Sequence, residues 1–141
     1  MTSVLVDTSA FFALTDRSDV NHARARKALA RLGRDGRELL TTTYVLDETL
    51  TLVRLRLGHP HAVTLGEKLM ASTWCRILDI SAELRQAAWE IFVRHSDQTF
   101  SFTDCTSFAV MRAMRLSEAF TFDRGDFGAA GFVVVPPVGR Q

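Results

Sequence analysis

Val4-Leu5-Val6-Asp7-Thr8-Ser9, close to the N-terminus, is the stretch that decides the fold. Its apolar run, which begins at Ser3, stops abruptly at Asp7. A buried strand that is followed at once by a helix gives this pattern, because the strand is apolar on both faces and the helix begins at a capping residue. We therefore expect a buried strand over 3–6 and a helix after Asp7.

The same alternation of short apolar runs and helical periodicity recurs along the chain. Strands separated by helices of ten or more residues favour right-handed crossovers and a parallel sheet. We therefore predict a three-layer α/β/α sandwich with a mostly parallel central sheet. The expected helices cover about 20–32, ending at Gly33 and Gly36, then 44–57, 62–72, 82–95 with Ser81 as its N-cap, and 101–116. The expected strands cover 38–42, 76–80, 118–122 and 132–135, with a turn over 123–127 between the last two.

A length of 141 residues suits one domain. We expect residues 1–137 to form a single domain and 138–141 to fray. A composition of 47% hydrophobic and 23% charged residues excludes a disordered or fibrous chain. Neither a membrane-spanning run nor a signal peptide is apparent, so we expect a cytoplasmic protein with no membrane partner. Cys75 and Cys105 are expected to be reduced, half-buried thiols.

The net charge of +1 gives no bulk attraction to nucleic acid. However, 15 of the 17 basic residues are Arg, which pairs with phosphate in a bidentate manner and stacks on bases. Two interpretations stay open for the arginines around the first long helix: a local positive face, or the solvated side of that helix and its exit. They are Arg24, Arg26, Arg31, Arg34 and Arg37.

Four acids occupy places where a two-faced α/β core should exclude charge. Asp7 and Asp123 end strands, Glu48 lies within the apolar helix 44–57, and Asp104 opens the helix 101–116. Each acid has an ordinary explanation as well. Asp7 could be an N-cap, Asp104 could form a capping box with Ser101, Asp123 could form an Asx turn, and Glu48 could form a buried ion pair with an Arg.

The parallel sheet predicts that these acids converge. Sites form beyond the carboxyl ends of the strands, where the strand order reverses. Clustered carboxylates raise one another's pKa unless a hard divalent cation such as Mg²⁺ or Mn²⁺ compensates them. The four histidines are scattered, and no glycine-rich phosphate loop occurs, so neither a zinc site nor nucleotide-cofactor chemistry is expected.

Four segments in this order resemble the PIN domain, and they are most similar to the VapC-type toxins of bacterial toxin–antitoxin pairs. The segments are Val4-Leu-Val-Asp-Thr-Ser-Ala10, Tyr44-Val-Leu-Asp-Glu-Thr-Leu50, Phe102-Thr-Asp-Cys-Thr-Ser-Phe108 and Thr121-Phe-Asp-Arg-Gly-Asp-Phe127. The resemblance covers nearly the whole chain, including the closing segment 131–135.

The resemblance implies an endoribonuclease that depends on Mg²⁺ or Mn²⁺. Its catalytic acidic quartet falls on Asp7, Glu48, Asp104 and Asp123, and its metal ligands fall on Asp7, Asp104 and Asp123 together with Asp126. Either Asp123 or Asp126 could hold a second ion or its water. Ser9 and Thr121 fall on small hydroxyl positions that support the acids. The implied partners are an RNA substrate, a small antitoxin that covers the cleft, and a second copy of the chain in a homodimer.

Two other functions compete with this interpretation. A signalling receiver domain needs paired acids after the first strand and a Lys after a late strand. Here Asp7 stands alone, and Lys27 and Lys68 both lie in predicted helices. The alternative that stays open is a catalytically silent PIN-like module that binds RNA or a partner without cutting.

Overall fold

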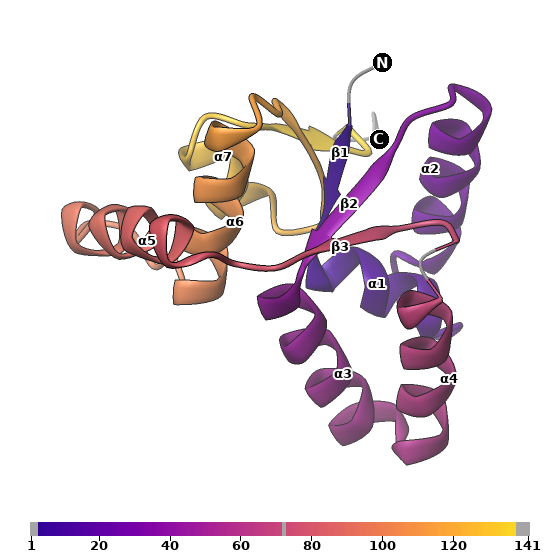
Figure 1. Cartoon of the computed structure of the whole chain (residues 1–141). Helices are drawn as coiled ribbons and strands as arrows, with labels where there is room; N and C mark the ends of the chain where they lie inside the picture. The colour runs from indigo at the N-terminus through magenta and orange to yellow at the C-terminus, as the bar shows by residue number, and fades with distance from the viewer. Residues whose placement is uncertain (1–2, 72, 138–141) are drawn as a thin grey trace.

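Five parallel strands form one sheet in the order β3-β2-β1-β4-β5 (Figure 1). The computed structural model describes residues 3–71 and 73–137. Within them the strands are β1 (Val4–Val6), β2 (Leu39–Thr42), β3 (Arg76–Leu78), β4 (Glu118–Phe120) and β5 (Val133–Val135). In β1, Leu5 pairs with Leu40 of β2 on one side and with Ala119 of β4 on the other. This confirms the predicted parallel sheet.

Helices cover both faces of the sheet, as Figure 1 shows. On one side lie α1 (Thr8–Thr15), α2 (His22–Arg34), α3 (Thr43–Leu57) and α4 (His59–Met70). On the other side lie α5 (Ala82–Arg94), α6 (Phe102–Ala113) and the short α7 (Arg124–Ala129). The predicted α/β/α sandwich is therefore confirmed.

Strand β1 separates two hydrophobic cores, because alternate side chains of a strand point to opposite faces. Val4 and Val6 pack into the core with Phe11 of α1. Leu5, between them, packs into the core with Phe108 of α6 and Phe127 of α7. All three β1 side chains are fully buried, which explains the uninterrupted apolar run in the sequence.

Several predicted element boundaries are wrong. Helix α2 passes through Gly33 and ends at Arg34, before Gly36 with its positive φ of 66°. Helix α4 begins at His59 rather than Ala62, since Pro60 fits the first helical turn. The turn predicted over 123–127 is the start of α7, because the Asp123 side chain caps the backbone and Phe127 is buried.

The remaining expectations have mixed outcomes. Ser81 caps α5 as predicted, through a hydrogen bond from the backbone N–H of Leu84. Cys75 and Cys105 are free thiols, but they are buried rather than half-buried. The predicted tail 138–141 and the expected helix end at Ser72 lie outside the described residues. Among the described residues, no helix is long and apolar enough to cross a membrane.

The chain reverses direction across the sheet at β1. From β1 it crosses to β2 and then β3 on one side, and it returns later to β4 and β5 on the other side. In such a sheet a crevice opens between the two halves at the carboxyl ends of the central strands. Those ends are the last residues of β1 and β4, which pair as Val6 with Phe120.

Candidate active site

The acids predicted to converge lie around the carboxyl ends of β1 and β4. Asp7 follows β1 directly, and Asp123 follows β4 after two residues. Asp104 lies in the first turn of α6, and Glu48 lies in the second turn of α3. Asp126, in the first turn of α7, completes the group.

Asp7 is the buried member of this group, with 5% of its surface exposed. It stands at the N-cap position of α1, yet its side chain makes no capping hydrogen bond. The N-cap explanation therefore describes its place in the chain but not what its carboxylate does. Burial raises the pKa of Asp7 from 3.8 to about 7, and the negative fields of Asp104 and Glu48 add to this, while a hydrogen bond from Thr121 opposes it.

A relay of hydroxyl groups holds Asp7. Thr121 Oγ1 donates to Asp7 Oδ2 at 2.9 Å and accepts the backbone N–H of Asp123 at 3.0 Å. Ser9 Oγ lies 2.9 Å from the same Thr121 oxygen and accepts the N–H of Phe122 at 2.8 Å. Since the Thr121 proton points to Asp7, the Ser9 hydroxyl donates to Thr121. The two hydroxyls thus connect the ends of β1 and β4.

Asp104 belongs to a capping box and to the acidic group at once. Its Oδ2 accepts the N–H of Ser101 at 3.1 Å, and Ser101 Oγ accepts the N–H of Asp104 at 3.0 Å. Burial raises the pKa of Asp104 to about 6, and the charges of Asp123 and Asp126 contribute. The capping box predicted as an alternative is therefore present, and it does not exclude an electrostatic role.

Asp123 and Asp126 form a pair at the start of α7. The Asp123 carboxylate accepts the backbone N–H of Asp126 at 3.3 Å. Burial, and then the charge of Asp126, raise the pKa of Asp123. One ligand oxygen from each of Asp104, Asp123 and Asp126 lies within 4.8 Å of the other two. Both Asp123 and Asp126 therefore reach the group that Asp104 joins.

Glu48 differs from its prediction. The explanation as a buried ion pair is wrong, because its side chain is exposed and it forms no ion pair among the described residues. Helix α3 buries Val45, Thr49 and Val53, a stripe with a spacing of four residues. Glu48 is offset from that stripe by one residue, or about 100° around the helix, which places it at the rim. The negative charge of Glu48 nevertheless contributes to the raised pKa of Asp7.

Sequence reasoning missed a buried hydroxyl pair beneath the acids. Thr49 Oγ1 of α3 donates to Thr8 Oγ1 of α1 at 3.2 Å, and both side chains are buried. The pair fixes α3, which carries Glu48, against the helix that follows Asp7. The available signal was a polar β-branched residue within an otherwise apolar helical stripe.

The donor set suits a hard divalent cation. Asp104, Asp123 and Asp126 are the one group of His, Cys, Asp or Glu that could hold an ion within residues 3–71 and 73–137, and all their donors are carboxylate oxygens. Such donors favour Mg²⁺ or Mn²⁺ over Zn²⁺. A doubly wound parallel sheet with this acidic centre at its reversal point defines an α/β domain whose clustered carboxylates could hold a divalent cation.

Comparison with known proteins agrees with this class. The profile of the PIN domain family matches residues 4–133. The chain is 42% identical over 134 residues to a Mycobacterium tuberculosis protein (strain H37Rv), the 23S rRNA-specific endonuclease VapC20, covering 95% of this chain and 98% of that protein. The chain therefore belongs to the PIN domain family, which confirms the resemblance predicted from its sequence.

Solved structures give the same result. The crystal structure of M. tuberculosis VapC20, described as a Sarcin-Ricin loop cleaving toxin, has a TM-score of 0.83 and 40% identity, covering 93% of this chain and 97% of that one. A DNA-bound VapBC from Salmonella typhimurium has a TM-score of 0.71 at 12% identity, covering 95% and 97%. That second likeness concerns the fold alone.

Replacing Asp7 by Asn should stabilise the metal-free protein in a pH-dependent manner. The pKa of Asp7 is about 7 in the folded protein, whereas its ordinary value is 3.8. The contribution of Asp7 to the stability of the fold is therefore complete below about pH 4 and is lost as the pH rises to about 7. In EDTA at about pH 8, we expect Asp7→Asn to raise the free energy of unfolding by roughly 2–4 kcal/mol. At about pH 4 we expect almost no gain. Urea unfolding measures both, with the exposed Asp97→Asn as control; an equal gain at both pH values would contradict this account.

Proposed function

We propose that this chain is an endoribonuclease that hydrolyses RNA phosphodiester bonds with the help of Mg²⁺ or Mn²⁺. The observation that carries the proposal is the carboxylate group at the sheet's reversal point, where burial and mutual repulsion raise the pKa values of Asp7 and Asp104. Repulsion of this kind is relieved by a cation. The 42% identity to a named 23S rRNA endonuclease supports RNA as the substrate.

Asp104, Asp123 and Asp126 would hold the ion, since their ligand oxygens lie within 4.8 Å of one another. Asp7 lies outside that group, and the family resemblance supports it as a further ligand. Ser9 and Thr121 would keep Asp7 in position. A bound divalent ion supplies a Lewis acid that activates water and binds a phosphate oxygen. Glu48, exposed at the rim, would orient the attacking water. Because water is the nucleophile, we expect products with a 3′-hydroxyl and a 5′-phosphate.

We further propose that the substrate is a loop of 23S rRNA and that the protein acts in the cytoplasm. The relatives support this, since VapC20 is named as specific for 23S rRNA and as cleaving the Sarcin-Ricin loop. Loops present unstacked nucleotides and accessible phosphates, which suits a site at the carboxyl ends of the central strands.

A hollow at the far end of α1 supports an antitoxin as partner. It has a volume of about 1090 Å³, and α1, α2 and α4 contribute to its wall. Leu29, Leu65 and Trp74 lie in its lining, while three cations, Arg17, Arg26 and Lys68, line it without an ion-pair partner among the described residues. Such a surface is complementary to a segment with apolar and acidic side chains. We propose that the antitoxin supplies that segment.

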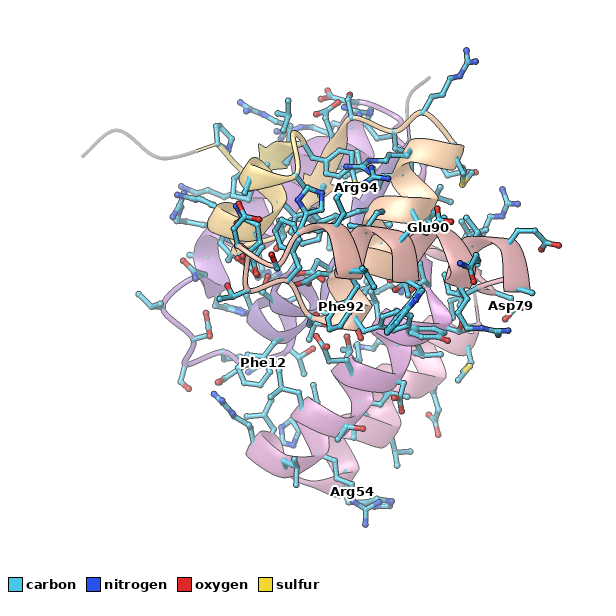
Figure 2. All side chains as sticks on the ribbon, turned by 90° about the vertical axis from the view of Figure 1, so that its left-hand side faces the viewer. Phe12, Arg54, Asp79, Glu90, Phe92 and Arg94 are labelled. Atoms are coloured by element: carbon cyan, nitrogen blue, oxygen red, sulfur yellow. The ribbon has the colours of Figure 1, made fainter. Side chains whose placement is uncertain are left out.

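An exposed apolar patch on α5 supports the homodimer. Trp89, Phe92 and Val93 are 52%, 42% and 59% exposed, and the first two rings stack with centroids 5.9 Å apart. Phe92 lies below the α5 ribbon in Figure 2, and its ring also contacts Phe102 of α6 at 6.0 Å. Patches of this kind mark protein contacts. We propose a second copy of the chain as the occupant.

The nuclease proposal predicts that Asp104→Asn abolishes metal-dependent cleavage. Loss of a residue that supports a metal ligand typically lowers metal affinity or activity roughly 10–100-fold. Replacing a ligand itself should lower the activity further. The assay is cleavage of a labelled Sarcin-Ricin loop RNA with Mg²⁺, with Mn²⁺ and with EDTA, and end analysis of the products. Asp97→Asn is the matched control. Wild-type protein that binds this RNA without metal-dependent cutting would instead indicate the silent module.

The antitoxin proposal predicts that reversing one charge in the hollow weakens the toxin–antitoxin complex. We expect Arg26→Glu to lower the affinity for the proposed antitoxin at least tenfold, since like charges at an interface cost several kcal/mol. Calorimetry measures the affinity. Arg85→Glu, on α5, is the control, and an equal loss in both variants would contradict the assignment.

The dimer proposal predicts that a charge in the α5 patch separates the copies. We expect light scattering to give a mass of two chains for the wild type and one chain for Trp89→Asp. The control is Val20→Asp, at a side chain that is 90% exposed outside the patch. A wild-type mass of one chain would refute the proposal directly.

A further inference from the structure

Two arginines on the helices that surround α1 lie over aromatic rings. Arg24 of α2 has its Cζ 6.0 Å from the ring centroid of Phe122, and Arg56 of α3 has its Cζ 5.9 Å from that of Phe12. Both rings are partly buried against the same core. Helices α2 and α3 both pack on α1, which begins directly after Asp7. The two arginines therefore come from the two helices that flank α1.

Arg24 is tied closely to the site. The backbone N–H of its ring partner, Phe122, donates to Ser9 Oγ, and the next residue is Asp123. Nη2 of Arg24 also donates to the carbonyl of Pro137 at 3.2 Å. One carbonyl and one ring thus hold this guanidinium next to the segment that carries Asp123, and its other N–H groups have no hydrogen-bond partner within residues 3–71 and 73–137.

Arg56 lies on the same face of α3 as Glu48. Glu48, Leu52 and Arg56 follow at a spacing of four residues, so the arginine is about 12 Å along the helix from the carboxylate. Among the described residues, Arg56 makes no hydrogen bond or ion pair besides its contact with the Phe12 ring. Phe12 belongs to α1, whereas Arg54 points away at the lower end of α3 in Figure 2.

An acidic centre needs cations around it to bind RNA. The five carboxylates of the site repel phosphates, and an ion at the centre compensates them only locally. Phosphate contacts from Arg or Lys dominate the affinity of proteins for nucleic acid. A guanidinium stacked on a ring keeps its N–H edge free for phosphate and loses little freedom on binding.

We propose that Arg24 and Arg56 contact backbone phosphates of the RNA on two sides of the cleaved bond, with Phe122 and Phe12 as the platforms that hold them. This inference rests on the proposed ribonuclease function, since it names the groups that position that substrate. Arg37, by contrast, is engaged in an ion pair with Glu118 and is not part of this set.

The salt dependence of RNA binding tests the proposal. A fluorescent single-stranded RNA with the Sarcin-Ricin loop sequence is titrated with the Asp104→Asn protein in Mg²⁺ between 50 and 200 mM salt. Each lost phosphate contact makes the negative slope of log K against log salt shallower by about 0.7 for single strands. We therefore expect Arg24→Gln and Arg56→Gln each to make the slope shallower by about 0.7 and to lower the affinity at 0.1 M salt about fivefold.

Three further variants separate a phosphate contact from a structural role. Arg54→Gln, on the same helix but without a ring contact, should leave the slope unchanged. Arg56→Lys should retain the slope, since the charge stays, whereas Phe12→Leu should weaken binding with the slope unchanged. Melting temperatures confirm that each variant folds. In the cleaving protein, Arg56→Gln should raise KM and leave kcat nearly unchanged.

The possible failures are distinguishable. Unchanged slopes in both Arg→Gln variants, or the same change in Arg54→Gln, would overturn the assignment of Arg24 and Arg56 and leave the ribonuclease proposal standing. A change of slope in only one of the two Arg→Gln variants would support a phosphate contact for that arginine and refute it for the other. If the Asp104→Asn protein bound no RNA and the wild-type protein did not cleave it with Mg²⁺ or Mn²⁺, the proposed function and this inference would both be wrong.

Discussion

The constraint on which the rest of the molecule depends is the burial of one carboxylate, Asp7, at the point where the sheet reverses direction. A buried charge is costly unless something compensates it, and here the neighbouring acids increase the cost. The fold keeps Asp7 in place through Thr121 and Ser9 instead of an arginine. No basic residue forms an ion pair with it in the described part of the chain. Burial without such an ion pair is what raises the pKa of Asp7.

Residues from both ends of the chain contribute to the site. Asp7 and Ser9 come from the N-terminal end, while Thr121 and Asp123 come from the segment after β4, more than 110 residues later. Pairing of β1 with β4 is what brings them together. Aromatic packing completes the support on the other face, where Phe108 of α6 contacts Phe127 of α7 at 5.0 Å. The helices that carry Asp104 and Asp126 are thereby held against each other.

Much of the fold could be predicted from the sequence, because buried parallel strands and capped helices leave strong local signals. The strand that precedes Asp7 and the Ser81 cap are examples. Helix α7 was mistaken for a turn, since six residues around Gly125 carry too little periodicity and their helix depends on Phe127 reaching the core. The exposure of Glu48 could not be predicted either, because it depends on the rotation of α3 about its own axis. The spacing of apolar residues in the sequence predicts which positions of a helix face the core only to within about one residue.

The capping hydrogen bonds around the acids have a consequence for ion selectivity. Asp104 has Oδ2 engaged by the N–H of Ser101, Asp7 has Oδ2 engaged by Thr121, and Asp123 has Oδ1 engaged by the N–H of Asp126. Engaging an oxygen of a carboxylate in this way favours monodentate over bidentate coordination. Ca²⁺ gathers six to eight oxygens and often takes both atoms of a carboxylate, whereas Mg²⁺ is smaller, octahedral and retains waters. If the site holds an ion as proposed, these hydrogen bonds favour Mg²⁺ over Ca²⁺.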